Sequence, residues 1–290
     1  MKVELVVDSK SLLGEGAIWH AKTATLYWVD IERHHLYVYD PGTRANRTID
    51  LGQRIGTVVP KKTGGLLLAL EDGFSHLDLQ TETITKIVDP EADIADNRFN
   101  DGKCDPAGRF WAGTVSLTGK RETASVYRLD KDYSVSQMIS RVSISNGIVW
   151  SLDKSKMYYI DTPTQQVAAY DYDDRTGGIA NRTVAVTVPR QMGLPDGMTI
   201  DAQGKLWIAL FGGSAVTRWD PDTSKLLEKV TIPVQNVTSC ALGGELLQDM
   251  YVTTAREGMT EEQLRAQPQA GGLYRFVSPV AGLPAFEFDG

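Results

Sequence analysis

The clearest pattern in the chain is the segment Leu194-Pro195-Asp196-Gly197-Met198-Thr199-Ile200-Asp201-Ala202-Gln203-Gly204-Lys205-Leu206-Trp207-Ile208-Ala209. Apolar residues alternate with other residues on both sides of Asp201-Ala202-Gln203-Gly204, which is the two-residue period of β-strands. The four residues between the two runs have the composition of a tight turn. The segment is therefore predicted to be a β-hairpin, and Asp196 is predicted to lie at its open end, immediately before the first strand.

The same arrangement returns along the chain, so that six repeats can be read. Their first strands open beside glycines spaced about 40 to 50 residues apart, which is the blade period of a β-propeller. Each repeat has room for four antiparallel strands, and four such strands make one blade. We therefore predict an all-β fold in which residues 1–290 form a single six-bladed β-propeller domain.

Two segments outside the repeats have predicted places in this fold. Residues 2–7 form a spare strand without a partner in their own repeat, and we expect them to close the ring by completing the last blade. Thr260-Glu261-Glu262-Gln263 has the spacing of a capping box, which predicts a short helix in the loop 256–271.

Composition excludes several classes of function. With 30 basic against 37 acidic residues the net charge is −7, and no basic cluster indicates a nucleic-acid partner. Apolar residues make up 42% of the chain, but no run is long enough to span a bilayer, and the N-terminus lacks the apolar region of a signal peptide. We expect a cytoplasmic monomer without membrane contact, whose two cysteines are buried free thiols.

Polar residues fall in one shared register of the repeats. The positions just before the predicted inner strands, which would ring one mouth of the channel, are Glu15, Ile55, Asp101, Asn146, Asp196 and Ser239. Carboxylate and amide oxygens brought together from separate blades suit a hard divalent cation. A single Asx-Gly pair is more often a turn, and Asp72-Gly73, in mid-repeat, is interpreted as one. The shared register indicates a metal site.

These residues stand within longer motifs that resemble the SMP-30/gluconolactonase/LRE family. The resemblance covers nearly the whole chain and is carried by Gly14-Glu15-Gly16, 97–103, Ser145-Asn146-Gly147, Pro195-Asp196-Gly197, 158–161, 170–173 and 251–253. It implies a six-bladed propeller with one divalent metal ion in its channel. It also implies hydrolysis of a small-molecule partner, a sugar lactone such as gluconolactone, to the aldonic acid.

The resemblance also implies roles for individual residues. Glu15, Asn146 and Asp196 would be the protein ligands of the metal ion, and Asp196 would also be the catalytic general acid/base. Arg98 and Asn100 would bind the hydroxyl groups of the sugar. Independently of the family, lactone hydrolysis needs a polarised carbonyl, an activated water and a carboxylate that moves a proton, and a metal-bound carboxylate meets these needs.

One departure from the family pattern means that the sequence does not identify the preferred sugar lactone. The family has a substrate-binding glutamate a few residues after Ala112-Gly113-Thr114, where this chain has residues 115–118 without an acid. Glu122 is the candidate that would replace it. The sequence does not identify the metal ion either, because a site of oxygen ligands with one free face accepts Ca²⁺, Mg²⁺, Mn²⁺ or Zn²⁺.

Three other functions are compatible with the predicted scaffold, because a fold alone does not select a function. The first is a calcium-binding regulatory protein without turnover. The second is a phosphotriesterase-like hydrolase, and the third, ranked last, is a platform for protein interactions.

Overall fold

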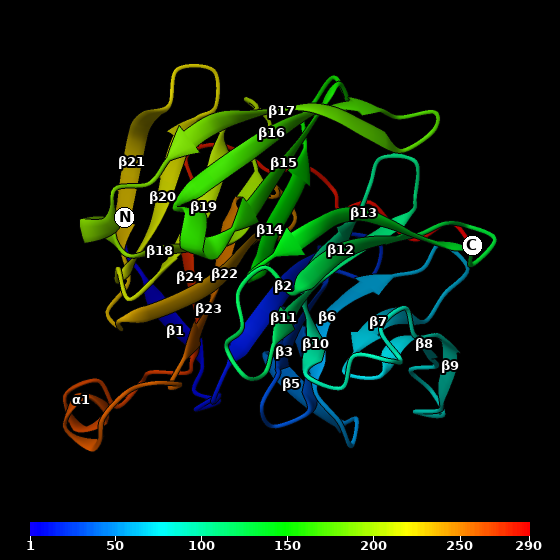
Figure 1. Ribbon diagram of the computed structural model, residues 1–290. Helices are drawn as coiled ribbons and strands as arrows, with labels where there is room; N and C mark the ends of the chain where they lie inside the picture. Colours follow the sequence, from blue (N-terminus) through cyan, green and yellow to red (C-terminus); the bar gives the residue numbers. More distant parts are fainter.

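Six four-stranded antiparallel sheets are arranged in a ring in the computed structural model, which describes residues 1–290 (Figure 1). Blade one consists of β2 (Gly14–His20), β3 (Thr25–Asp30), β4 (His35–Asp40) and β5 (Ala45–Asp50). Blade two consists of β6 (Ile55–Pro60), β7 (Leu66–Leu70), β8 (Gly73–Leu77) and β9 (Ile84–Val88). Blade three consists of β10 (Asn97–Cys104), β11 (Phe110–Ser116), β12 (Ala124–Leu129) and β13 (Val135–Val142).

The second half of the ring repeats this order. Blade four consists of β14 (Ser145–Trp150), β15 (Lys156–Asp161), β16 (Gln166–Asp173) and β17 (Gly178–Thr187). Blade five consists of β18 (Leu194–Ile200), β19 (Leu206–Phe211), β20 (Ala215–Asp220) and β21 (Lys225–Thr231). Blade six contains β22 (Asn236–Gly243), β23 (Asp249–Ala255) and β24 (Leu273–Val277), and its fourth strand is β1 (Glu4–Val7). The predicted six-bladed β-propeller is confirmed.

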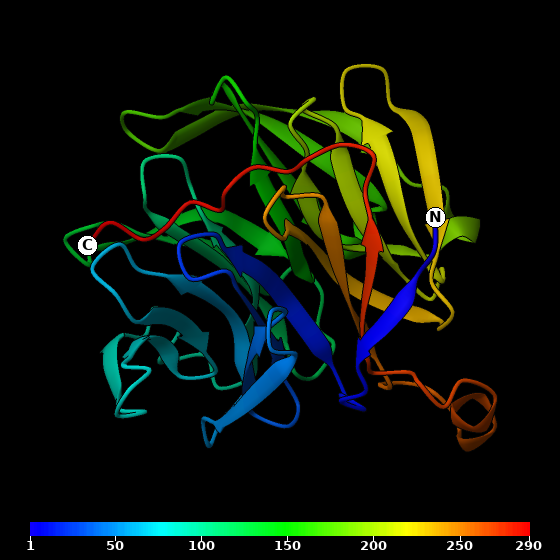
Figure 2. The ribbon, with the colours of Figure 1, turned by 180° about the vertical axis from the view of Figure 1, so that it is seen from behind.

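The N-terminal strand closes the ring as the sequence predicts. β1 pairs antiparallel with β24, with Glu4 opposite Arg275 and Leu5 opposite Tyr274. Figure 2 shows the N-terminal strand β1, in blue, beside β24, in red. The Arg275 guanidinium lies 2.8 Å from a Glu4 carboxylate oxygen and adds an ion pair to the strand pairing. The last blade therefore combines the N-terminal strand with the last three strands of the chain.

The segment after β24 crosses back over one face of the ring (Figure 2). The Ala202 amide of blade five donates to Ala281, at 2.8 Å. Further along, the Phe288 amide donates to the carbonyl of Pro60 in blade two, at 2.9 Å. Phe288 is fully buried, so this segment anchors its end in the core.

The chain contains three short helical elements. The helix α1 (Glu261–Ala266) begins with the predicted capping box, in which the Gln263 amide donates to the Thr260 hydroxyl and the Gln263 side chain accepts from the Thr260 amide. Two 3₁₀ turns, η1 (Thr162–Thr164) and η2 (Arg190–Met192), complete the set. No helix of the chain has the length and apolar character needed to cross a membrane. Both cysteines are buried and free.

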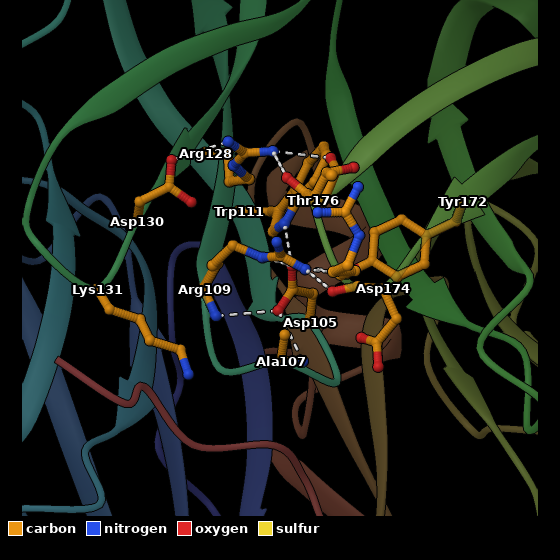
Figure 3. Close-up of polar contacts among 12 residues, drawn as sticks. Asp105, Ala107, Arg109, Trp111, Arg128, Asp130, Lys131, Tyr172, Asp174 and Thr176 are labelled. Atoms are coloured by element: carbon orange, nitrogen blue, oxygen red, sulfur yellow. Dashed lines mark hydrogen bonds and ion pairs between the residues drawn. The ribbon is translucent and has the colours of Figure 1, made fainter.

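Buried aspartates at hairpin turns hold the blades together. Asp105, fully buried, accepts hydrogen bonds from Arg109 Nε at 2.6 Å, Trp111 Nε1 at 3.0 Å and the Tyr172 hydroxyl at 2.8 Å (Figure 3). Tyr172 lies in blade four, so the cluster joins neighbouring blades. Asp201 accepts in the same way from Trp207 Nε1 at 3.1 Å. A buried carboxylate needs such partners, which explains the aspartate in the predicted turn 201–204.

Every inner strand contains one break in its register at the same level of the channel. The breaks lie between Glu15 and Ile18, Ile55 and Thr57, Phe99 and Gly102, Ser145 and Ile148, Pro195 and Met198, and Val237 and Ser239. The expectation that Asp196 lies just before its strand is therefore wrong, because Asp196 lies within β18 at a bulge. A bulge leaves a residue unpaired and re-aims its side chain, which explains why chemistry-bearing residues gather there.

The glycines that follow Asn146 and Asp196 are required because there is no space for a side chain, not because the chain turns there. A Cβ built on Gly147 would lie 2.9 Å from the Asp196 carbonyl oxygen, and one on Gly197 would lie 2.8 Å from Ser239 Cα. Neighbouring inner strands thus approach closely at the bulges. Asp72-Gly73, in contrast, is the plain turn that the sequence indicates, because Asp72 lies between β7 and β8.

Candidate metal centre and substrate pocket

A cavity of about 450 Å³ opens at one mouth of the channel, at the level of the bulges. Five of the predicted site residues line it, namely Glu15, Arg98, Asn100, Asn146 and Asp196. They come from blades one, three, four and five, so only closure of the ring brings them together. Three of them, Glu15, Asn146 and Asp196, were selected by the shared register of the repeats, and Arg98 and Asn100 by the family resemblance; the register positions Ile55 and Ser239 do not line the pocket.

Glu15 and Asp196 form a buried acidic pair in this pocket. Their exposed fractions are 5% and 6%. Burial, and then the charge of Asp101, raise the pKa of Glu15 to about 8. Burial, and then the charges of Glu15 and Asp101, raise the pKa of Asp196 well above its usual range. Two carboxylates in such a site favour a proton or a cation between them.

Asn146 supplies a third oxygen. Its Nδ2 donates to the Thr162 hydroxyl at 2.8 Å, and that hydroxyl donates to the Pro195 carbonyl at 2.8 Å. This chain orients the amide, and Asn146 Oδ1 receives only a long contact of 3.4 Å from Asn100 Nδ2. Nowhere in the chain do three or more His, Cys, Asp or Glu side chains gather as a metal cluster. Two carboxylates and one oriented amide oxygen fit a hard divalent cation.

Arg98 carries unused hydrogen-bond donors beside this oxygen cluster. Its Nη1 donates to Asn100 Oδ1 at 2.8 Å and to the Phe99 carbonyl at 3.0 Å. Its Nε is buried without a partner, and burial lowers the pKa of the guanidinium. Because Arg98 lines the pocket, its guanidinium group can donate to a ligand oxygen.

Asp101, which belongs to the ring read from the sequence, does not line the pocket. One carboxylate oxygen accepts from the Gly102 amide at 2.6 Å, and the other is buried without a partner. Burial raises the pKa of Asp101. The negative charge of Asp101 raises the pKa values of Glu15 and Asp196, which do line the pocket.

Glu122 is the predicted site residue that the structure does not bring into the pocket. Its side chain is 57% exposed and pairs with Arg141 at 2.6 Å. The wall where the family glutamate would stand contains Val115, Ser116 and Leu117 instead.

Sequence reasoning missed three charged residues of this pocket, Glu32, Arg54 and Glu257. Arg54 directly precedes the ring position Ile55, a signal that could have identified it. Glu32 and Glu257 lie in connecting loops, where no periodic pattern marks a residue.

A second cavity, of about 480 Å³, lies toward the opposite ends of the inner strands. Its lining is mostly apolar, including Trp19, Trp150 and Phe286, and Lys103 is its charged residue. It lacks the converging oxygens of the first cavity.

The fold and the pocket define a class of protein, a six-bladed β-propeller with a charged, oxygen-lined pocket at one mouth of its channel. Residues 13–256 match the family described as SMP-30/Gluconolactonase/LRE-like region. The chain belongs to this family, as the motifs of the sequence indicate.

Similar proteins cover the whole chain. The Bacillus subtilis (strain 168) protein named "Putative sugar lactone lactonase YvrE" is 40% identical over 290 residues, covering 100% of this chain and 99% of that protein. Regucalcin of Xenopus laevis is 40% identical over 296 residues, with coverage of 100% and 99%. The structure of a calcium-binding protein, regucalcin, from Agrobacterium tumefaciens is similar with a TM-score of 0.94 at 26% identity, covering 98% and 96% of the two chains.

Proposed function

We propose that this protein is a metal-dependent lactonase that hydrolyses sugar lactones, such as gluconolactone, to aldonic acids. The observation that carries the proposal is the convergence of Glu15, Asn146 and Asp196 in one pocket beside Arg98 and Asn100. The family and the relative named a sugar lactone lactonase support lactone hydrolysis in general.

The proposal assigns a divalent cation to Glu15, Asn146 and Asp196. When bound, the cation would polarise the lactone carbonyl and lower the pKa of a water molecule. Asp196 accepts the proton of the attacking water and returns it to the ring oxygen that leaves as an alcohol. Arg98 and Asn100 hold the sugar hydroxyls and orient the carbonyl. The name of the Agrobacterium relative supports a divalent cation, with Ca²⁺ as the first candidate.

A pH-indicator assay on a panel of aldonolactones tests the proposal, using chelator-treated protein with single metal ions added back. We expect acid release that depends on the added ion, and the ranking identifies the preferred sugar and ion. Tight metal binding without release above the spontaneous rate would support a calcium-binding regulatory protein. Faster turnover of an organophosphate would support a phosphotriesterase-like hydrolase. Sedimentation of the same sample tests whether the protein acts as a monomer.

Asn146→Ala is expected to weaken metal binding by at least about 10-fold, because it removes one oxygen ligand and the hydrogen bond to Thr162. Calorimetric titration of the metal-free protein measures this change. Asn181→Ala is the matched control, since Asn181 is exposed and outside the pocket. Equal metal affinity in both variants would remove Asn146 from the ligand set.

A further inference from the structure

The lining of the pocket contains two chemically different sets of residues. The apolar set comes from blades three to five and consists of Val115, Leu117, Ile144, Leu194 and Phe211. The charged set consists of Glu32, Arg54, Arg98 and Glu257. The hydroxyl groups of a substrate are expected to face this charged set.

Glu32 is the most firmly held carboxylate of the charged set. It lies in the turn between β3 and β4, and both of its carboxylate oxygens accept from Arg54 Nε, at 3.0 and 3.2 Å. Arg54 is itself held by Glu71, whose oxygens lie 3.3 and 3.4 Å from Arg54 Nη1. The Glu32 side chain is 24% exposed. Such a supporting contact fixes a binding group before the ligand arrives.

Glu32 lies next to Arg98, the residue assigned to the sugar hydroxyls. The Glu32 carboxylate and Arg98 Nε form an ion pair at 3.9 Å, which is too long for a hydrogen bond. Arg98 Nε is buried, so the partly exposed carboxylate of Glu32 is the group that a ligand in the pocket reaches. A hydroxyl group of the ligand can donate to this carboxylate.

We propose that Glu32, positioned by Arg54, is a specificity residue that selects lactones with ring hydroxyl groups. This inference rests on the proposed lactonase function and deepens it. Glu32 lines the same pocket as Val115 and Leu117, and it supplies a carboxylate where residues 115–118 contain no acid. The substrate class is a neutral polyhydroxylated lactone, because the carboxylates of Glu32 and Glu257 balance the guanidinium groups of Arg54 and Arg98 and leave no excess positive charge to bind a phosphate.

The test compares a hydroxylated lactone with an unsubstituted one. In Glu32→Ala, kcat/KM for gluconolactone is expected to fall by about 10- to 100-fold, mainly through KM, whereas kcat/KM for δ-valerolactone stays unchanged. Glu32→Gln retains one acceptor oxygen and is expected to recover part of the loss. Arg54→Met removes the side chain that holds the Glu32 carboxylate. It is also expected to lower kcat/KM for gluconolactone relative to kcat/KM for δ-valerolactone.

Glu82→Ala is the matched control, because Glu82 also pairs with an arginine, Arg47 at 2.5 Å, but outside the pocket. It should leave both substrates unaffected. An equal loss on both lactones in Glu32→Ala, or a loss of discrimination in Glu257→Ala alone, would overturn the proposal. So would faster turnover of a 6-phosphorylated gluconolactone than of the neutral one by the unaltered protein.

Failure of the proposed function is recognised separately, because the unaltered protein would then release no acid from any lactone. In that case calorimetry with a non-hydrolysable cyclic ether of a hexitol still tests Glu32. Weaker binding of this polyol by Glu32→Ala than by Glu82→Ala supports the role of Glu32 as a hydroxyl acceptor. Equal binding overturns it.

Discussion

Replacing Asp196 by asparagine is expected to lower kcat for aldonolactone hydrolysis by about 10²- to 10⁴-fold, with the fold preserved. Asparagine has nearly the same shape and keeps one oxygen in the pocket, but it cannot accept a proton from water. The position of Asp196 supports this role, because its carboxyl group is buried in the pocket that Glu15 and Asn146 also line. In the metal-free protein, burial and the charges of Glu15 and Asp101 raise its pKa. A bound cation would favour the ionised form, which is the form that accepts a proton.

The matched control is Asp72→Asn, which makes the same change in an Asp-Gly pair that forms a turn between β7 and β8. Initial rates of acid release at saturating substrate and metal ion measure kcat, and circular dichroism checks the fold. The control should retain full turnover. Near-normal hydrolysis by Asp196→Asn would show that another group moves the proton.

The architecture was predictable because its determinants are local. The two-residue alternation of apolar residues marks the strands, and the 40- to 50-residue spacing marks the blades. The capping box at Thr260 and the spare strand before Val7 are also visible in a few neighbouring residues. Glu15, Asn146 and Asp196 followed from the same register, because ring closure brings equivalent positions of different blades to one level of the channel, whereas Arg98 and Asn100 followed from the family resemblance.

The positions of the other pocket residues depend on features that the alternation of apolar and polar residues does not reveal. A bulge adds an unpaired residue without changing the composition of a strand, so Asp196 was expected before β18 rather than within it. Glu32 and Glu257 enter from loops, whose course is set by tertiary contacts. Glu122, close in sequence to the family position, lies outside the pocket and pairs with Arg141.

Without a bound cation, the protein is expected to lose stability as the pH rises from about 4.5 to about 8. The pKa of Glu15 is raised from 4.5 to about 8 in the folded state, so the folded protein binds more protons than the unfolded chain in this window. The free energy of unfolding therefore falls with rising pH. Because one pKa unit corresponds to about 1.4 kcal/mol, the raised pKa values of Glu15 and Asp196 together are expected to cost a few kcal/mol across the window.

Chemical denaturation of chelator-treated protein at several pH values measures this loss. Glu15→Gln removes the ionisable group and is expected to flatten the dependence on pH, which separates Glu15 from other titrating residues. A saturating divalent cation should restore stability most strongly near pH 8, because it binds the ionised carboxylates. Near pH 7 that binding should release protons from the acidic pair, seen as a heat that depends on the ionisation enthalpy of the buffer. If the unaltered protein and Glu15→Gln lose stability equally with pH, and cation binding releases no proton, the buried acidic pair is not the cation site.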